Sequence, residues 1–133
     1  MRRVPPSELH DYWAWVRKGL EKIKETARDE WLPEDVYTAI RNDAAQLYVT
    51  DNHDGFVVVN LLSGYDGGRE MHVWCAYGES VDLTKESDVL DQVAEGLGCK
   101  RITFFSARKG WAKNRIGYEE VHTLYRKVIN GRV

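Results

Sequence analysis

The sequence has few cysteines and prolines and no long apolar run. Its 133 residues include two cysteines and three prolines. Cys75 and Cys99 have neither metal-ligand spacing nor a nearby histidine pair, which argues against a disulfide framework or a metal site and predicts small, partly buried thiols. No apolar stretch approaches the roughly 20 residues of a membrane-spanning helix. The opening Met-Arg-Arg-Val-Pro-Pro leads into no apolar segment, so we expect no secretory signal, no membrane partner and a cytoplasmic location.

The charges are nearly balanced. The chain has 19 Lys and Arg against 21 Asp and Glu, a formal net charge of −2. A protein whose main partner is nucleic acid usually has a clear excess of positive charge, so we do not expect nucleic acid as the partner. A group of basic residues around Trp111 could still contact a nucleic acid. We favour the alternative, in which these residues form a solvated helix face and Trp111 packs inward. The members of this group are Lys100, Arg101, Arg108, Lys109, Lys113 and Arg115.

The length fits one domain over residues 1–133, large enough to need no disulfide or metal for stability. Two amphipathic helices come first. Ser7 is placed to cap the first, whose apolar stripe has the three- and four-residue spacing of a helix: Leu9, Trp13, Val16, Leu20, Ile23 and Ala27. Pro33 begins the second, with Val36, Ile40 and Ala44 on its inner face. We therefore expect two helices before any strand.

The middle of the chain predicts three antiparallel strands, over residues 46–50, 56–62 and 70–77, separated by turns rich in Asp, Asn and Gly. In the third strand, strict alternation places Met71, Val73, Cys75 and Tyr77 on one face of the sheet. The opposite face also carries bulky residues. This pattern favours a sheet covered on both sides by helices.

A crossover follows. Residues 84–97 have a helical apolar stripe with Thr84 as a possible cap, and residues 100–107 form a strand, so the strands at 70–77 and 100–107 should be parallel neighbours. A short helix over 108–116 and a final strand over 118–129 complete the order ααβββαβαβ. The fold class is α/β (α+β), a single domain with a mixed, mostly antiparallel sheet, one parallel βαβ crossover and helices on both faces.

The last part of this order carries a resemblance to a known family. A strand, a short helix with Arg108-Lys109-Gly110-Trp111, the pair Gly117-Tyr118 and a long final strand resemble the C-terminal half of the GNAT acetyltransferase superfamily, especially its divergent bacteriophage-encoded members. By topology the resemblance covers nearly the whole chain, with the family's first strand absent or displaced. It implies transfer of an acyl group from acetyl-coenzyme A to an amine, in the host cytoplasm if the protein is phage-encoded.

The resemblance also implies site residues. Glu70 and His72 lie on the strand that commonly supplies the base in the family, although we favour His72 as a half-exposed strand residue with no chemical role. Where many members have a tyrosine as general acid, four residues before the Gly-aromatic pair, this chain has Lys113. The coenzyme A contacts implied by the resemblance are Cys75, Tyr77, Gly78, Ser80 and Lys85. No metal is implied.

The turn from Gly78 to Lys85 departs from the family pattern. Members usually have a glycine-rich turn whose backbone N–H groups hold the coenzyme A pyrophosphate. Here Gly78 is the one glycine of the turn, and Glu79 and Asp82 add negative charge. Each carboxylate near the phosphates would disfavour binding by roughly 1 kcal/mol or more, so we expect weak coenzyme A binding or none. The alternative function is therefore a catalytically inactive GNAT-like protein that binds a protein partner or is a virion component in phage assembly, without a working coenzyme A site.

Overall fold

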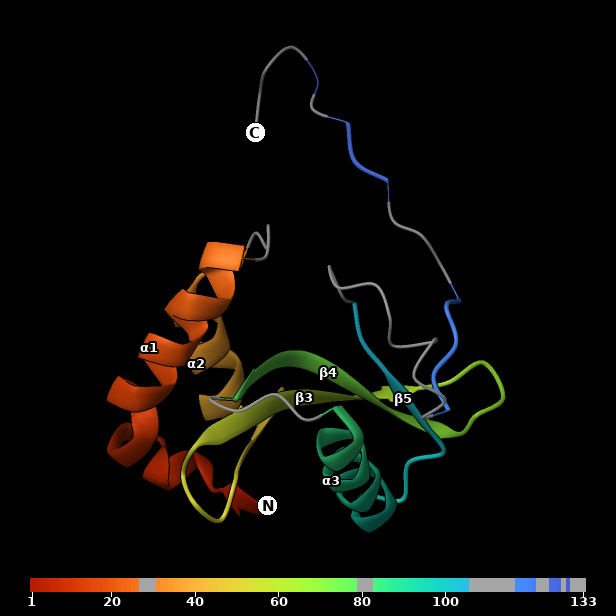
Figure 1. The fold of residues 1–133 in the computed structure, drawn as a ribbon, viewed down its shortest axis with the longest axis horizontal. Coiled ribbons are helices and arrows are strands. Elements are labelled where there is room, and N and C mark those ends of the chain that lie inside the picture. The colour runs from red at the N-terminus through yellow and green to blue at the C-terminus, as the bar shows by residue number, and fades with distance from the viewer. Residues whose placement is uncertain (27–30, 79–82, 106–116, 122–124, 128, 130–133) are drawn as a thin grey trace.

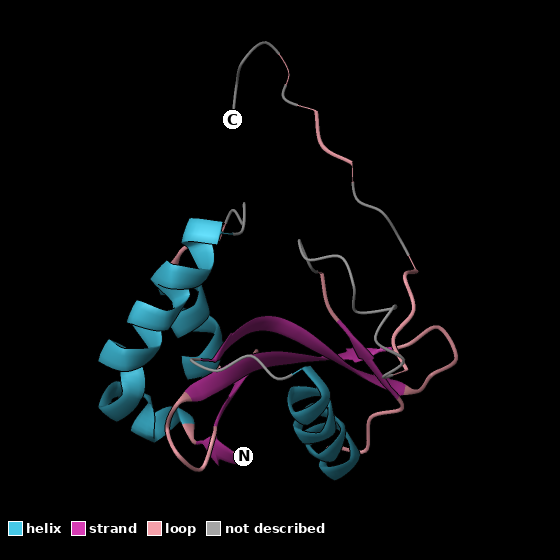
Figure 2. Ribbon diagram, viewed as in Figure 1, coloured by secondary structure: helices cyan, strands magenta, loops and turns pink. Residues whose placement is uncertain are grey.

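The computed structural model describes residues 1–26, 31–78, 83–105, 117–121, 125–127 and 129; of residues 26 and 83–86 it describes the backbone alone. Figures 1 and 2 show helices packed on both sides of a twisted sheet. The elements in chain order are β1 (Arg2–Val4), a 3-10 helix (Pro6–Glu8), α1 (Leu9–Thr26), α2 (Pro33–Arg41), β2 (Gln46–Val49), β3 (Gly55–Ser63), β4 (Arg69–Gly78), α3 (Leu83–Gly96) and β5 (Arg101–Thr103).

The five strands form one sheet in the order β1-β2-β3-β4-β5. Neighbouring strands are antiparallel from β1 to β4, whereas β4 and β5 are parallel. Helix α3 connects that parallel pair. The mixed sheet and its single parallel crossover confirm the fold class expected from the sequence.

Strand β1 corrects the expectation that two helices precede any strand. Residues Arg2 to Val4 pair with β2, with Arg2 opposite Val49 and Val4 opposite Leu47. A three-residue strand with one buried side chain, Val4, is too short to show alternation in the sequence. Ser7 is not the cap of α1: it lies inside the 3-10 helix that begins after Pro5 and leads into α1.

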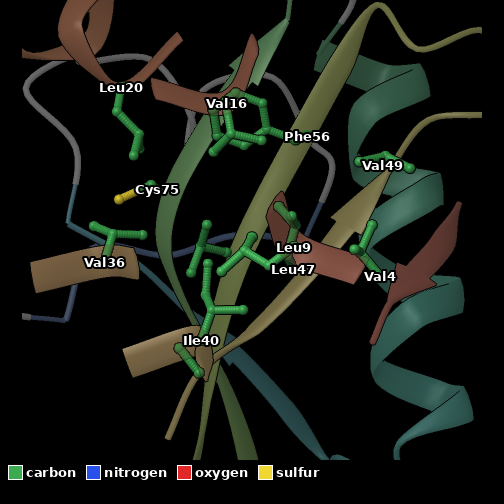
Figure 3. Packing of buried hydrophobic residues seen from close by; sticks show 12 residues of the cluster. Val4, Leu9, Val16, Leu20, Val36, Ile40, Leu47, Val49, Phe56 and Cys75 are labelled. Carbon is green, nitrogen blue, oxygen red and sulfur yellow. The ribbon is translucent and has the colours of Figure 1, made fainter. Parts of the chain in front are cut away.

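The sheet has a helical layer on each face. Helices α1 and α2 cover one face and α3 covers the other (Figure 1). Figure 3 shows the first layer, where Cys75 of β4 lies among Leu20 of α1 and Val36 of α2. The predicted stripe of α1 forms much of this core, because Leu9, Val16 and Leu20 are fully buried. On the other face, α3 packs on Tyr48, Val57, Val59, Met71 and Val73 through Leu90 and Ala94.

The C-terminal part differs from the sequence prediction. The described residues after Gly117 form no strand, and Val121, Tyr125 and Ile129 are 69%, 87% and 68% exposed. Alternating polar and apolar residues show which side chains can share a face, but a strand also needs a hydrogen-bonded partner. The predicted helix 108–116, with Trp111, lies outside the described residues. Cys75 and Cys99 are both free, and no helix in the described ranges is long and apolar enough to cross a membrane.

Candidate functional site

The candidate site lies where β5 leaves β4. The two strands are paired only over Glu70 to His72 of β4 and Arg101 to Thr103 of β5, a region we call the β4–β5 junction. Beyond it, residues 76–78 of β4 pair with β3 on one side, and no described residue pairs with them on the other. We call residues 76–78 the open edge of β4. Figure 1 shows β5 running away from β4 there. Backbone groups on an open strand edge can bind an extended ligand.

A β-bulge interrupts β4 between the junction and this open edge. Cys75 lies opposite Val58 and Val73 lies opposite Val59, so Trp74 is an extra residue in β4. Val73 consequently packs on the α3 side, whereas Trp74 and Cys75 both pack on the α1 and α2 side. The sequence prediction that Met71, Val73, Cys75 and Tyr77 share one face is therefore wrong after Val73. A bulge also bends its strand and disrupts the local ladder, which shapes the backbone beside the junction.

His72 lies at the last paired position of the junction. Its Nδ1 is 2.9 Å from Oγ1 of Thr103, the residue opposite it on β5. Its ring meets the ring of Phe105 edge-on, with centroids 5.4 Å apart. Burial lowers the pKa of the His72 imidazole, and the nearby carboxylate of Glu70 opposes that shift. His72 is thus a neutral imidazole near pH 7, the form that can accept a proton.

Glu70, the second candidate base, is held in an ionic cluster. Nε of Arg101 donates to Oε1 of Glu70 at 2.7 Å, and the same guanidinium donates to both carboxylate oxygens of Asp66, at 2.7 and 3.1 Å. Hydrogen bonds from Arg101 and from the backbone N–H of Gly68 hold the pKa of the Asp66 carboxyl well below its usual range. The ring of exposed Tyr65 lies 5.0 Å from the Arg101 guanidinium. With its carboxylate bound to Arg101, Glu70 is less available as a base than His72.

Of the predicted coenzyme A contacts, Cys75 comes directly before the open edge of β4, and Tyr77 and Gly78 belong to it. Cys75 is buried, Tyr77 is half-buried and Gly78 ends the strand in an exposed position. The Tyr77 ring packs edge-on against Phe56, and its hydroxyl is 3.4 Å from Nζ of Lys22 on α1. Ser80 and Lys113 lie outside the described residues. Lys85 belongs to α3, of which the structure describes only the backbone there.

Several residues of the junction were not among those predicted from the sequence. Thr103 looked like an ordinary strand residue, and Arg101 was assigned to the basic group around Trp111. The ion pairs with Asp66 and Glu70 give Arg101 a structural role instead. Tyr118, next to Gly117, packs its ring on Phe104 at 5.2 Å between centroids, and burial raises the pKa of its phenol. Because Phe104 packs on the α3 side, Tyr118 lies across the sheet from His72.

Other surface features lie away from the junction. One hollow lies between α1 and α2 with Trp13 and Tyr37 in its wall, and another lies beside Tyr12 and His53. Within the described ranges, no three His, Cys, Asp or Glu residues come together as metal ligands.

Solved structures share this arrangement of elements. A crystal structure described as a probable acetyltransferase has a TM-score of 0.64 at 14% identity, over 99% of this chain and 100% of that one. A ribosomal-protein-alanine N-acetyltransferase from Brucella melitensis biovar Abortus 2308 has a TM-score of 0.60 at 18% identity, over 96% of this chain and 95% of that one. The chain has the GNAT acetyltransferase fold.

A third GNAT-fold match is an aminoglycoside acetyltransferase from an uncultured soil metagenomic sample, in complex with sisomicin. Its TM-score is 0.62 at 13% identity, over 96% of this chain and 95% of that one. No protein-family model and no curated protein matches the sequence. At these identities the similarity establishes the GNAT fold, and any activity has to be argued from this chain's own residues.

Proposed function

We propose that this GNAT-fold protein is an N-acyltransferase that uses acyl-coenzyme A, preferably acetyl-coenzyme A, and an amine. The observation that carries the proposal is the position of His72 at the β4–β5 junction, on the strand that continues into the open edge of β4. One structural feature thus offers a backbone edge for an extended ligand and a neutral imidazole for proton transfer.

The open edge suits the pantetheine arm of coenzyme A. That arm contains amide groups, which can bond to a strand edge as another strand would. Residues 76–78 are paired with β3 on one side only in the part of the chain that the structure describes. In the proposal, backbone groups of these residues make these bonds. When bound, acyl-coenzyme A supplies a thioester whose acyl carbon is open to attack by an amine.

His72 is the proposed general base. An amine must be unprotonated to attack an acyl carbon, and a neutral imidazole within hydrogen-bond reach can accept its proton. Half-burial beside Phe105 keeps His72 neutral, because burial disfavours the imidazolium form. Lys113 stays a prediction for the acid that protonates the departing thiolate.

The test has two measurements. A ligand at about 100 times its Kd stabilises the native state by roughly 2.7 kcal/mol, which raises the melting temperature of a domain of this size by several degrees. Millimolar acetyl-coenzyme A should therefore shift the melting curve. The His72→Gln variant should show the same shift, while release of free coenzyme A in the presence of a panel of amines should fall about 100-fold or more.

The second candidate is a noncatalytic GNAT-fold binding protein, associated with a phage particle if the gene is phage-borne. The sequence of the turn after Gly78 favours this binding protein, because the negative charges of Glu79 and Asp82 would repel the phosphates of coenzyme A. The same titration separates the two candidates. An unchanged melting temperature in millimolar acetyl-coenzyme A would reject the acyltransferase and leave the binding protein.

A further inference from the structure

Thr103 and His72 form the last side-chain pair of the β4–β5 junction. They lie opposite each other in register, and Nδ1 of His72 is 2.9 Å from Oγ1 of Thr103. Two residues earlier in each strand, and therefore on the same face of the sheet, Glu70 lies opposite Arg101. Nε of Arg101 donates a hydrogen bond to Oε1 of Glu70 at 2.7 Å. Both pairs join β4 to β5 through side chains, just before the strands separate.

The partner of Nδ1 determines what the other ring nitrogen can do. A neutral imidazole carries one proton, so one nitrogen donates a hydrogen bond and the other accepts. A threonine hydroxyl can take either role. If Nδ1 donates to Oγ1 of Thr103, the lone pair lies on Nε2. If the hydroxyl donates to Nδ1, Nε2 carries the proton and cannot accept another.

We propose that Thr103 is a positioning residue whose Oγ1 accepts a hydrogen bond from Nδ1 of His72 and thereby keeps the Nε2 lone pair free for the acceptor amine. This inference rests on the proposed acyltransferase function. Thr103 also fixes the plane of the ring together with Phe105, which packs edge-on against it. The base therefore depends on a residue of the neighbouring strand.

The ionic cluster keeps Thr103 in register. Arg101 precedes Thr103 by two residues and binds Glu70 on β4 and Asp66 in the turn between β3 and β4. A shift of β5 by one residue would reverse the faces of its side chains and remove the hydroxyl from His72. Arg101 thus holds the strand that presents Thr103.

The test reads the His72 tautomer directly by ¹⁵N NMR of histidine-labelled protein above pH 7, without acyl-coenzyme A. The four histidines give few signals, and the His72→Gln variant assigns the relevant one. The wild type should carry its proton on Nδ1. Thr103→Val, which keeps the branched shape but has no hydroxyl, should move the proton to Nε2 in most molecules, and Thr103→Ser should restore the wild-type tautomer.

Activity gives the second readout. Thr103→Val should lower kcat/KM about 10- to 100-fold, the range that loss of a histidine-orienting partner costs at metal sites. Thr103→Ser should recover most of that loss. A wild-type proton on Nε2, or a tautomer unchanged in Thr103→Val, would overturn the inference whether or not acetyl-coenzyme A binds. Failure of the proposed function would appear separately, as an unchanged melting temperature with acetyl-coenzyme A.

Discussion

Gly19 of α1 lies directly against the ring of Phe56 on β3. A Cβ atom at position 19 would come within 2.5 Å of Cε2 of Phe56 and within 2.8 Å of Cδ1 of Tyr77. Phe56 is fully buried, and the rings of Trp15 and Tyr77 meet it edge-on at 5.5 and 5.6 Å. The missing side chain at Gly19 lets α1 approach Phe56 and Tyr77 of the sheet this closely.

Substitution of Gly19 tests this contact. Gly19→Ala gains up to about 1 kcal/mol in helix propensity, but the added methyl group clashes with two packed rings, and overpacking a core typically costs about 1–3 kcal/mol. We expect a net loss in the free energy of unfolding, measured by urea denaturation. Gly96→Ala is the matched control, because a Cβ atom at that α3 position meets nothing within 4 Å. Equal stability of the two variants would contradict the close approach.

The ionic cluster predicts an acid-dependent contribution to stability. Arg101→Met keeps the length of the side chain but leaves the carboxylates of Asp66 and Glu70 without their cation, so the melting temperature at pH 7 should fall. Lys100→Met, at an exposed neighbouring position, is the control.

The pH dependence of this effect has a defined sign. Because the folded-state pKa of Asp66 is lowered, its stabilising effect is complete above the ordinary value of 3.8 and is lost as the pH falls through the lower folded-state pKa. The difference in melting temperature between wild type and Arg101→Met should therefore shrink below about pH 4. A constant difference down to pH 2 would show that Arg101 acts through packing instead.

The sequence predicted the parts of the fold that depend on local periodicity. Leu9, Val16 and Leu20 recur at helical spacing and are buried as expected, because a helix sets its faces by its own period. The crossover from β4 through α3 to β5 was also predicted, since two strand patterns flank a helical one. Helix ends were less certain: α3 begins at Leu83, one residue before the expected cap.

The junction could be predicted only in part, because it depends on partners distant in sequence. His72 was a candidate, but its contact with Thr103, 31 residues away, requires the β4–β5 register. The bulge at Trp74 was missed because alternation describes a single strand, whereas a bulge exists only relative to the partner strand. Arg101 was assigned to a basic surface group for the same reason, because its ion-pair partners Asp66 and Glu70 are distant in sequence.

The bulge gives a test of the proposed ligand edge. Deleting Trp74 would restore the regular alternation of side chains along β4, because Val73 would stay on the α3 side and Cys75 on the α1 and α2 side. The fold should therefore survive at reduced stability. The shape of the open edge would change, and the melting-temperature shift with acetyl-coenzyme A should disappear. Trp74→Ala loses the side chain but keeps the extra residue, so it should retain the shift. Equal shifts in both variants would exclude the bulge from the site.

The last prediction concerns the titration of His72. Its folded-state pKa is lowered by burial, against an ordinary value of 6.5. Between the folded-state pKa and 6.5 the unfolded chain binds more protons, so the free energy of unfolding should rise with pH and level off above about 6.5. Glu70 is the charged group that opposes the shift, whereas the partners on β5, Thr103 and Phe105, are uncharged.

Urea denaturation of the wild type and of His72→Gln at pH 7.5, 6 and 5 measures this contribution, because glutamine does not titrate. The stability of the wild type relative to the variant should decrease as the pH falls. Identical pH dependence in the two proteins would show that His72 is not buried as described. Because the proposed base must be neutral, kcat/KM should fall along the same titration, with a midpoint at the folded-state pKa and therefore below 6.5.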